Sequence, residues 1–563
     1  MLGSPVASPA ASNKLRIARW LLCHAVIPVA LAFLVVRALL PTVETPTDPI
    51  ERARLLVEAG VPQSAVFELK RELQERPHDL SLHRALLWAH FRSPVSRGRG
   101  SMRDDEGMRR RYELLTHSAE ASERDLGLYG LGYFAFYAHD LEPALDAWDA
   151  VENTSLSGLA LGRARALNTL GRFEEALPLL EQAVRDVDAD VVARAHAERA
   201  MALRGLAQWG ALDAHVAAHP DHTPPNVQGS LLLHQRRFLD YAAHFTGYFA
   251  TGAGWPYTLV VLLAGALWVR VIRRWTPEPP VSLATSVLVT LSGALAAHFL
   301  YLVHDATALL FSVGPTGDLL QDAAYYMGWV GTIEEAVKLL PLALLALAGR
   351  SPRAPVGWVV LGCLSALGFA TYENLVYAGR MGSSTVMTRS FVSTLVHVFM
   401  TGSIVLSLPE ARLRRWSAPI TTVAVFATVA LVHGAFDLLA SRTTGVLSVF
   451  AFVVFVFGGS FFMYGLGGAI RASSPTASSA SVERSPTDET LALVMRHAFL
   501  VLSALIVADG FVVPTARHAF IALGHGFDVM VAYMAAMLVA LVHVPEAWDP
   551  SWPRQVFARR TAP

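Results

Sequence analysis

The sequence predicts an all-α membrane protein, in which a polytopic bundle of about ten transmembrane helices is joined to an α-solenoid of helical repeats. The composition is the first indication, because 53% of the 563 residues are hydrophobic and only 16% are charged, as in membrane proteins with a sizeable soluble part. The second indication is a polar, repetitive stretch between residues 46 and 224. The chain is too long for one ordinary domain. Its formal net charge of zero gives no indication of nucleic-acid binding.

The first element is an apolar segment that ends near Leu40 and follows Lys14, Arg16 and Arg19. It is longer than the hydrophobic region of a typical signal peptide and lacks a clear cleavage site, so we expect an uncleaved signal anchor. The basic residues in front of it place the N-terminus in the cytoplasm.

Residues 46–224 resemble tetratricopeptide repeats, whose alanines allow paired helices to approach and whose large residues fill the groove between repeats. The stretch 93–124 departs from the pattern and is interpreted as a degenerate repeat or a charged insertion. An irregular helical bundle is the alternative, but we favour a solenoid that presents a peptide- or protein-binding surface. The residues at repeat positions are Gly171, Phe173, Ala176, Leu180 and Ala183, with earlier copies at Ala144, Trp148 and Val151 and at Gly60, Ala65, Leu69 and Pro77, and a weaker copy at Trp209.

The remaining apolar segments predict nine further membrane spans. Every second loop between them is rich in arginine, as the positive-inside rule requires, so the repeat domain is expected outside the cytoplasm. We expect a multi-pass protein of the bacterial inner membrane. The spans are 255–272, 282–304, 323–347, 356–378, 389–408, 419–440, 445–468, 495–514 and 520–543.

These segments define six regions along the chain. A serine-, proline- and threonine-rich linker separates the last two helices from the rest. The regions are 1–45 (cytoplasmic N-terminus and anchor), 46–224 (repeat domain), 225–281 (connector and second span), 282–468 (catalytic core), 469–494 (linker) and 495–563 (two appended helices and a cytoplasmic tail).

Four apolar segments each carry a polar pair spaced four residues apart, which places each pair on one helix face. Ionisable groups within a bilayer are costly, and by default they indicate function. The topology places all four sites in the middle or outer part of the membrane, so we expect one buried reaction centre. The pairs are Glu334 with Lys338, Glu373 with Tyr377, His397 with Thr401, and His433 with Asp437.

These residue types suit attack of water on an amide carbonyl. A carboxylate in apolar surroundings can act as a general base, and the adjacent Glu334 and Glu335 point about 100° apart on a helix. Lys338 can neutralise either carboxylate. Imidazoles can stabilise an oxyanion, transfer protons or bind a metal, and Asp437 and Thr401 can fix their tautomers. No phosphate-binding loop is present.

The motifs EEAVK, FATYENLVY, HVFMT and HGAFD, in this order, resemble the signature of the PrsW family of intramembrane proteases. That family is related to the larger group containing CAAX prenyl endopeptidases and bacteriocin-immunity proteins. The resemblance covers about residues 282–468. It implies that Glu334 and Glu335 form the catalytic acidic pair, with Glu373, His397 and His433 at the other catalytic positions. It also implies the first cleavage of a membrane-bound anti-sigma factor, a signalling step on the extracytoplasmic side.

The expected substrate is a single-span membrane protein in the lipid bilayer, and the repeat domain is expected to bind a protein or peptide partner. A glutamate-activated water is favoured over a metal cofactor, because no H-E-x-x-H helix is present. The alternative is zinc held by His397, His433 and Glu373. A proton-coupled transporter and a non-catalytic scaffold are the alternative functions. Transporters usually show internal symmetry, and the sequence shows none.

The arginine-rich loops generate a prediction about topology. A reporter fused near Ala150 should be extracytoplasmic and one near Ala480 cytoplasmic, because positively charged loops stay inside. Labelling of a single cysteine at each position in intact cells checks this. If position 150 reacts only after the membrane is breached, the orientation is reversed.

Overall fold

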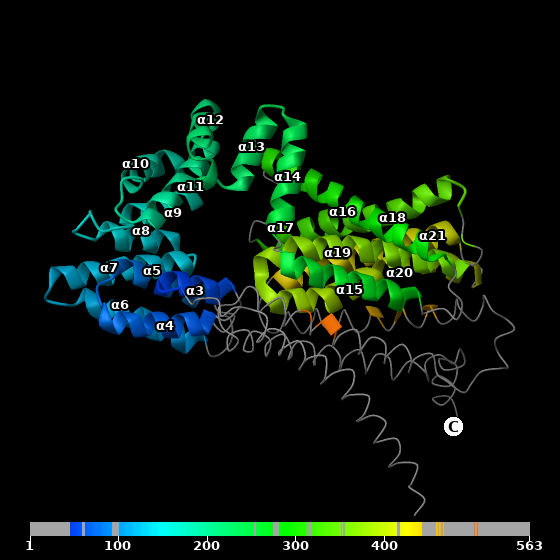
Figure 1. Ribbon diagram of the computed structural model, residues 1–563, viewed down its shortest axis with the longest axis horizontal. Helices are drawn as coiled ribbons and strands as arrows, with labels where there is room; N and C mark the ends of the chain where they lie inside the picture. The colour runs from blue at the N-terminus through cyan, green and yellow to red at the C-terminus, as the bar shows by residue number, and fades with distance from the viewer. Residues whose placement is uncertain are drawn as a thin grey trace, which may run out of the picture. The chain divides into compact units, whose positions relative to one another are not determined.

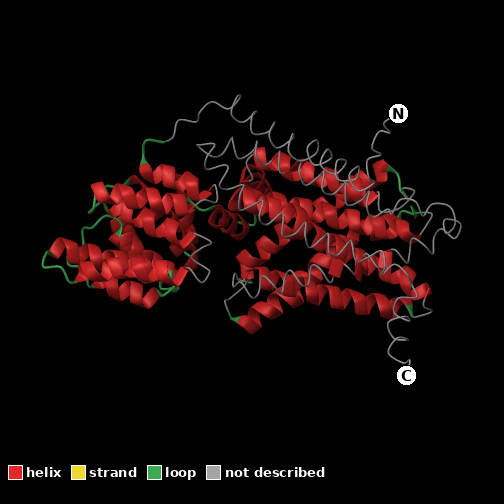
Figure 2. Cartoon of the chain, turned by 90° about the horizontal axis from the view of Figure 1, so that it is seen from below, coloured by secondary structure: helices red, strands yellow, loops and turns green. Residues whose placement is uncertain are grey.

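The computed structural model describes a chain made of helices, with no strand among the described residues (Figure 2). The described residues are 46–58, 62–92, 101–252, 255–273, 281–311, 314, 318–350, 352, 355–413, 417–441, 458, 459, 461, 462, 465, 466, 500, 501 and 504. The predicted anchor, the linker 469–494 and nearly all of the two appended helices lie outside them.

The chain divides into two compact units, which we describe separately. The helical unit comprises residues 44–251 and 302–313. Its helices are α3 (Pro49–Glu58), α4 (Pro62–Glu75), α5 (Leu80–Arg92), α6 (Ser101–Thr116), α7 (Ala121–Tyr137), α8 (Leu141–Asp149), α9 (Leu159–Thr169), α10 (Phe173–Ala183), α11 (Ala189–Gly205), α12 (Trp209–Ala218), η3 (Pro220–His222), α13 (Pro225–His234) and α14 (Phe238–Gly252) (Figure 1).

Four helix pairs in this unit share one turn geometry. The pairs α7–α8, α9–α10, α11–α12 and α13–α14 are each joined by three residues. The middle residue of each turn has a left-handed backbone: His139, Gly171, Ala207 and Arg236. The next residue donates its N–H to the carbonyl five positions earlier, as Arg172 does to Leu167, which closes the helix end in a Schellman-type turn. The unit is thus built from repeated helical hairpins, while their assignment as tetratricopeptide repeats stays a prediction.

Small residues at the predicted repeat positions let these hairpins pack closely. Ala144 and Ala176 are completely buried, and Trp148 is 1% exposed. A Cβ atom added at Gly132 or Gly162 would lie 2.2 Å or 2.9 Å from the Trp148 ring. The indole therefore fills a space that only glycine leaves open, and its Nε1 donates to the Tyr129 carbonyl at 3.2 Å.

The helical unit continues past the predicted end at residue 224, to residue 251. The reason is apolar packing, because Val227 and Leu231 of α13 share a buried cluster with Leu203 and Leu212 of the preceding hairpin. Much of the charged stretch 93–124 is also helical, since it forms α6 and the start of α7.

The membrane unit contains the remaining described helices. They are α15 (Trp255–Arg273), α16 (Leu283–Phe311), α17 (Leu319–Ala323), the π-helical η4 (Ala324–Val330), α18 (Gly331–Leu347), α19 (Pro355–Thr388), the π-helical η5 (Arg389–Ser393), α20 (Thr394–Leu413) and α21 (Ala418–Ser441). The last residues of α16, from 302 onwards, group with the helical unit.

Four described segments are long and apolar enough to cross a membrane: Leu283–Phe311, Pro355–Ala378, Arg389–Pro409 and Ala418–Leu439. They coincide with four of the ten predicted spans. The predicted spans 255–272 and 323–347 are also helical, but they are not among these four. The other predicted spans lie wholly or largely outside the described residues, so the total of ten stays a prediction.

Helices α19 and α20 form the centre of the membrane unit. Their spanning segments are 78% and 83% buried, against 22% and 28% for those of α16 and α21. Helix α19 packs against α15, α18 and α20, and α20 packs against α21. Apolar side chains such as Leu291 and Phe299 on α16 are exposed, as expected of a surface that meets lipid.

Replacement of Trp148 by alanine tests the packing of the hairpins. The variant should lose about 3–5 kcal/mol of unfolding free energy, because a large cavity would open between Gly132 and Gly162. Thermal unfolding followed by circular dichroism measures the change. Phe238→Ala is the matched control, because Phe238 begins α14 but is 60% exposed, and it should change the unfolding free energy by less than about 0.5 kcal/mol. Equal effects of the two substitutions would contradict this packing.

Candidate active site

The predicted polar residues converge because their helices cross closely. Helix α18 packs against α19 and α21, and η4 also packs against α21. A Cβ atom at Gly331 would lie 2.2 Å from the Ala430 carbonyl oxygen, and one at Gly434 would lie 2.2 Å from that of Tyr326. Glycine at both positions therefore permits backbone contact, as is common between membrane helices. This contact places His433 beside the glutamates of α18.

Lys338 is the centre of the cluster. Its Nζ lies 2.9 Å from Oε1 of Glu335, 3.3 Å from Oε2 of Glu334 and 2.8 Å from Nδ1 of His397. The side chain is fully buried, and the ammonium also lies 4.5 Å from the centre of the Phe369 ring. A buried ammonium needs such partners because its desolvation is costly.

Glu335 is held through both carboxylate oxygens. Oε2 accepts a hydrogen bond from Thr401 at 2.7 Å. Oε1 accepts one from Lys338 and lies 2.8 Å from Nδ1 of His433. Because Glu335 is fully buried and engaged by three helices, it orients its neighbours rather than facing a substrate.

Glu334 is held more loosely. In the described part of the chain its ion pairs all involve Oε2, which lies 3.3 Å from Lys338 Nζ and 3.7 Å from Nε2 of His433. Its side chain is 11% exposed, while those of Glu335 and Lys338 are 0% exposed. Glu334 is therefore the carboxylate of the pair that is available to a reactant.

Glu373 and His397 form a second arm of the site. Oε2 of Glu373 lies 2.8 Å from Nε2 of His397, and Oε1 lies 2.6 Å from Nη2 of Arg389. The Arg389 guanidinium also lies over the Tyr377 ring, 3.9 Å from its centre. His397 thus links the Lys338 cluster to the Glu373–Arg389 ion pair.

The π-helical turn η5 positions this second arm. A π-helical turn breaks the regular pattern of backbone hydrogen bonds and often occurs at functional sites. Here the Arg389 carbonyl accepts hydrogen bonds from Asn374 Nδ2 at 3.3 Å and Thr394 Oγ1 at 2.9 Å. The Ser390 carbonyl accepts one from Trp268 Nε1 at 2.8 Å. These side chains hold η5 in the place where α20 begins.

The structure brings the five predicted catalytic residues into one cluster and places the supporting residues around it. Lys338 and Thr401 are within it, Asp437 lies 3.5 Å from Nε2 of His433, and Tyr377 reaches the cluster only through Arg389. The sequence analysis did not identify Arg389 as a site residue. It could have been found as a charged residue at the first position of the predicted span 389–408.

The site contains the donors for a metal ion. Among the described residues, ligand atoms of Glu334, His397 and His433 lie within 4.8 Å of one another, and two histidines with one glutamate form a known zinc-binding set. The carboxylate near both histidines is thus that of Glu334, whereas the sequence hypothesis used Glu373 as the candidate third ligand. Both ring nitrogens of His433 are buried and make no hydrogen bond in the described chain, although Nδ1 lies 2.8 Å from Oε1 of Glu335 and Nε2 lies 3.5 Å from Oδ2 of Asp437. The donors fit a divalent cation, although Lys338 already contacts His397.

The charges around this cluster do not balance. Among the described residues, Glu334 and Glu335 are paired with Lys338 and Glu373 with Arg389, while the carboxylate of Asp437 is paired with His433. Buried charge of one sign is costly. Protons on a carboxyl group or an imidazole, or a bound cation, must therefore offset the excess.

Substitution of Lys338 tests its role as the central cation. Lys338→Met should lower the unfolding free energy by about 3–5 kcal/mol, because buried carboxylates then lose their partner. The double variant Lys338→Met/Glu335→Gln should recover part of the loss, since it also removes one buried charge. Thermal unfolding of detergent-purified protein measures both. A double variant less stable than the single one would contradict the ion-pair interpretation.

One of three comparisons with known proteins gives a match. Neither the curated proteins nor the solved structures gave a match. Residues 280–460 match the family model described as PrsW family intramembrane metalloprotease. This segment is about a third of the chain and contains every residue of the cluster, so the part of the protein that carries the site is similar to the PrsW proteases.

Proposed function

We propose that the membrane unit is an intramembrane endopeptidase that hydrolyses a peptide bond of a membrane-anchored protein. The observation that carries this proposal is the different environment of the two adjacent glutamates. Glu335 is fixed by Lys338 and Thr401, whereas Glu334 is held more loosely, 3.7 Å from Nε2 of His433. A carboxylate that is free to take a proton from water can act as a general base, and rigidly held groups beside it can stabilise the charge that develops.

In this mechanism Glu334 accepts a proton from water as the water oxygen bonds to the substrate carbonyl carbon. The carbon–nitrogen bond then breaks, and Glu334 delivers the proton to the leaving nitrogen. His433, with Glu335 beside its Nδ1, stabilises the negative charge on the carbonyl oxygen when its Nε2 is protonated. Lys338 keeps Glu335 ionised, and Glu373 orients His397.

A metal-dependent route is the second candidate, because Nε2 of His433 lacks a hydrogen-bond partner and the donor set fits. Glu334, His397 and His433 would hold the ion. A carboxylate lies beside the other nitrogen of each histidine, Glu335 for His433 and Glu373 for His397, which is the usual outer support of a metal-bound imidazole. A bound zinc ion lowers the pKa of its water and polarises a carbonyl.

The finer identity of the substrate is also a proposal. By the PrsW resemblance, the substrate is a single-span protein such as an anti-sigma factor, cut near the extracytoplasmic face of a bacterial inner membrane. The helical unit offers a place to bind a peptide of the substrate or of a partner. It has a cavity of about 260 Å³ whose lining includes Arg84, Arg165, Arg194, Trp88 and Tyr137, a mixture of charged and aromatic groups that suits peptide recognition.

Two substitutions distinguish the proposed general base, Glu334, from the proposed structural carboxylate, Glu335. Glu334→Gln should lower cleavage of a tagged single-span substrate by about 10²–10⁴-fold without lowering the thermal stability. Glu335→Gln should also abolish cleavage, but with a loss of stability, because Lys338, Thr401 and His433 share its oxygens. Immunoblotting of the substrate fragment and thermal unfolding provide the two measurements.

Asp318→Asn is the matched carboxylate-to-amide control, because Asp318 caps α17 and is not a member of the cluster, and it should cleave normally. Dialysis against a chelator distinguishes the two routes. Cleavage that survives supports direct activation by Glu334, and cleavage that is lost and restored by Zn²⁺ supports the metal route. Near-normal cleavage by the Glu334→Gln/Glu335→Gln double variant would disprove the assignment of the site.

A further inference from the structure

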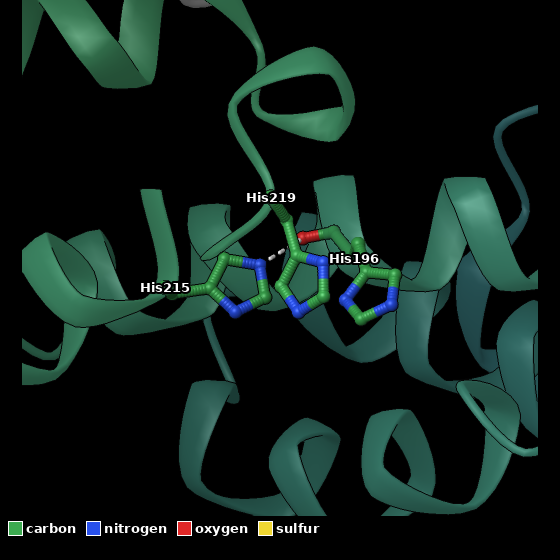
Figure 3. A group of neighbouring side chains, drawn as sticks. All are labelled: His196, His215 and His219. Carbon is green, nitrogen blue, oxygen red and sulfur yellow. Dashed lines mark hydrogen bonds between the residues drawn. The ribbon is translucent and has the colours of Figure 1, made fainter. Parts of the chain in front are cut away.

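A second cluster of histidines lies in the helical unit, which contains none of the residues of the candidate active site. His196 belongs to α11, His215 to α12, and His219 follows the end of α12. One ring nitrogen from each lies within 4.8 Å of the other two. Figure 3 shows the three rings in a row, with His219 in the middle. Three imidazoles this close together form a potential ligand set for a transition metal.

His215 is already oriented as a metal ligand would be. Its Nε2 lies 3.0 Å from the backbone oxygen of His196, the contact drawn as a dashed line in Figure 3. Nε2 therefore donates its proton to this carbonyl, which leaves Nδ1 as the nitrogen with a free lone pair. Metal-binding histidines usually have their second nitrogen fixed by a backbone carbonyl or a carboxylate in this way.

His196 has a buried ring nitrogen that lacks a partner. In the described part of the chain, Nδ1 of His196 makes no hydrogen bond, and a buried polar atom without one is costly. Burial, together with His219, His215, His222 and Arg199, lowers the pKa of His196 to about 4. The form of histidine that binds metals is the neutral imidazole.

His219 can complete the set through a rotation of its side chain. It is the C-cap residue of α12, and its N–H still donates to the His215 carbonyl at 2.9 Å, so its backbone already lies beside the other two histidines. Its ring is stacked on that of His196, with a centroid separation of 3.8 Å. It needs to turn out of this stack to direct a lone pair at a shared ion. The exposed His222 of η3, whose ring centre is 5.9 Å from that of His196, offers a fourth ligand.

We propose that His196, His215 and His219 bind a divalent transition metal, Zn²⁺ under cellular conditions, and that this ion fastens the end of α12 to α11. An all-imidazole set without thiolates suits Zn²⁺, Cu²⁺ or Ni²⁺ rather than Mg²⁺ or Ca²⁺. The positive charge of Arg199, which acts on both His196 and His215, is partly offset by Glu181, whose Oε1 lies 3.8 Å from Nη2 of Arg199.

Cobalt binding tests the site, because Co²⁺ in a nitrogen-ligand site gives a visible absorption spectrum. The experiment uses the full chain, purified without a histidine tag, in a Glu334→Gln/His433→Gln background that removes ligands of the other cluster. We expect one Co²⁺ per chain, displaced by Zn²⁺. His219→Gln should weaken binding by at least about tenfold, since even the loss of an outer support costs 10–100-fold. His196→Gln should do the same.

His117→Gln is the control, because His117 is an exposed histidine of the same unit, and it should bind Co²⁺ normally. Zn²⁺ should also raise the melting temperature of the background protein, but not that of its His219→Gln variant, because a ligand stabilises only the fold that binds it. The same pair of proteins with the active-site residues intact should differ by one equivalent of Co²⁺. The proposal is overturned if the background protein binds no Co²⁺, or if His219→Gln binds it with unchanged stoichiometry and affinity.

Discussion

The membrane unit depends on one buried interaction, the contact of the Lys338 ammonium with Glu335. Two carboxylates on adjacent positions of α18 would repel each other in an apolar bundle, and neither is stable there without a counter-charge. Lys338 lies one turn further along the same helix and reaches both glutamates as well as His397 of α20. Because Thr401 and His433 then bind to the opposite sides of Glu335, three helices are fixed by a single carboxylate. The rigidity of Glu335 is what leaves Glu334 available.

Backbone irregularities give these charges their positions. The π-helical turns η4 and η5 precede the helices that carry Glu334 and His397. Each changes the register at which its helix enters the site. Gly331 then brings the start of α18, and Gly434 brings η4, into backbone contact with α21. A larger residue at either position would move His433 away from Glu335, so the chemistry depends on residues that carry no functional group.

The helical unit uses a different principle. Its hairpins repeat one turn geometry, in which the middle residue of the turn has a left-handed backbone. Large side chains pack directly on small residues, as the Trp148 ring does on Gly132 and Gly162. Consecutive helices of these hairpins pack against one another, α9 on α10 and α10 on α11 among them. Polar clusters such as His196 with His215 and His219 can therefore form between adjacent elements without involving the rest of the unit.

The sequence by itself determined the helical class, the presence of membrane spans and the four polar pairs of the site. These follow from local patterns, because a spacing of four residues defines a helix face whatever the helix packs against. Trp148 and Ala144 were identified as packing residues for the same reason. His215, His219 and His222 are also close in the sequence, but their partner His196 is on another helix, so spacing could not reveal the cluster.

Only the tertiary structure decided which member of each pair faces which partner. Glu334 and Glu335 are chemically identical, and their different environments arise from the rotation and crossing of α18 against α20 and α21. Arg389 joins the site because η5 turns it towards Glu373. The continuation of the helical unit through α13 rests on apolar contacts with Leu203 and Leu212. Such long-range contacts depend on side-chain volume and helix geometry together, and no local sequence pattern encodes them.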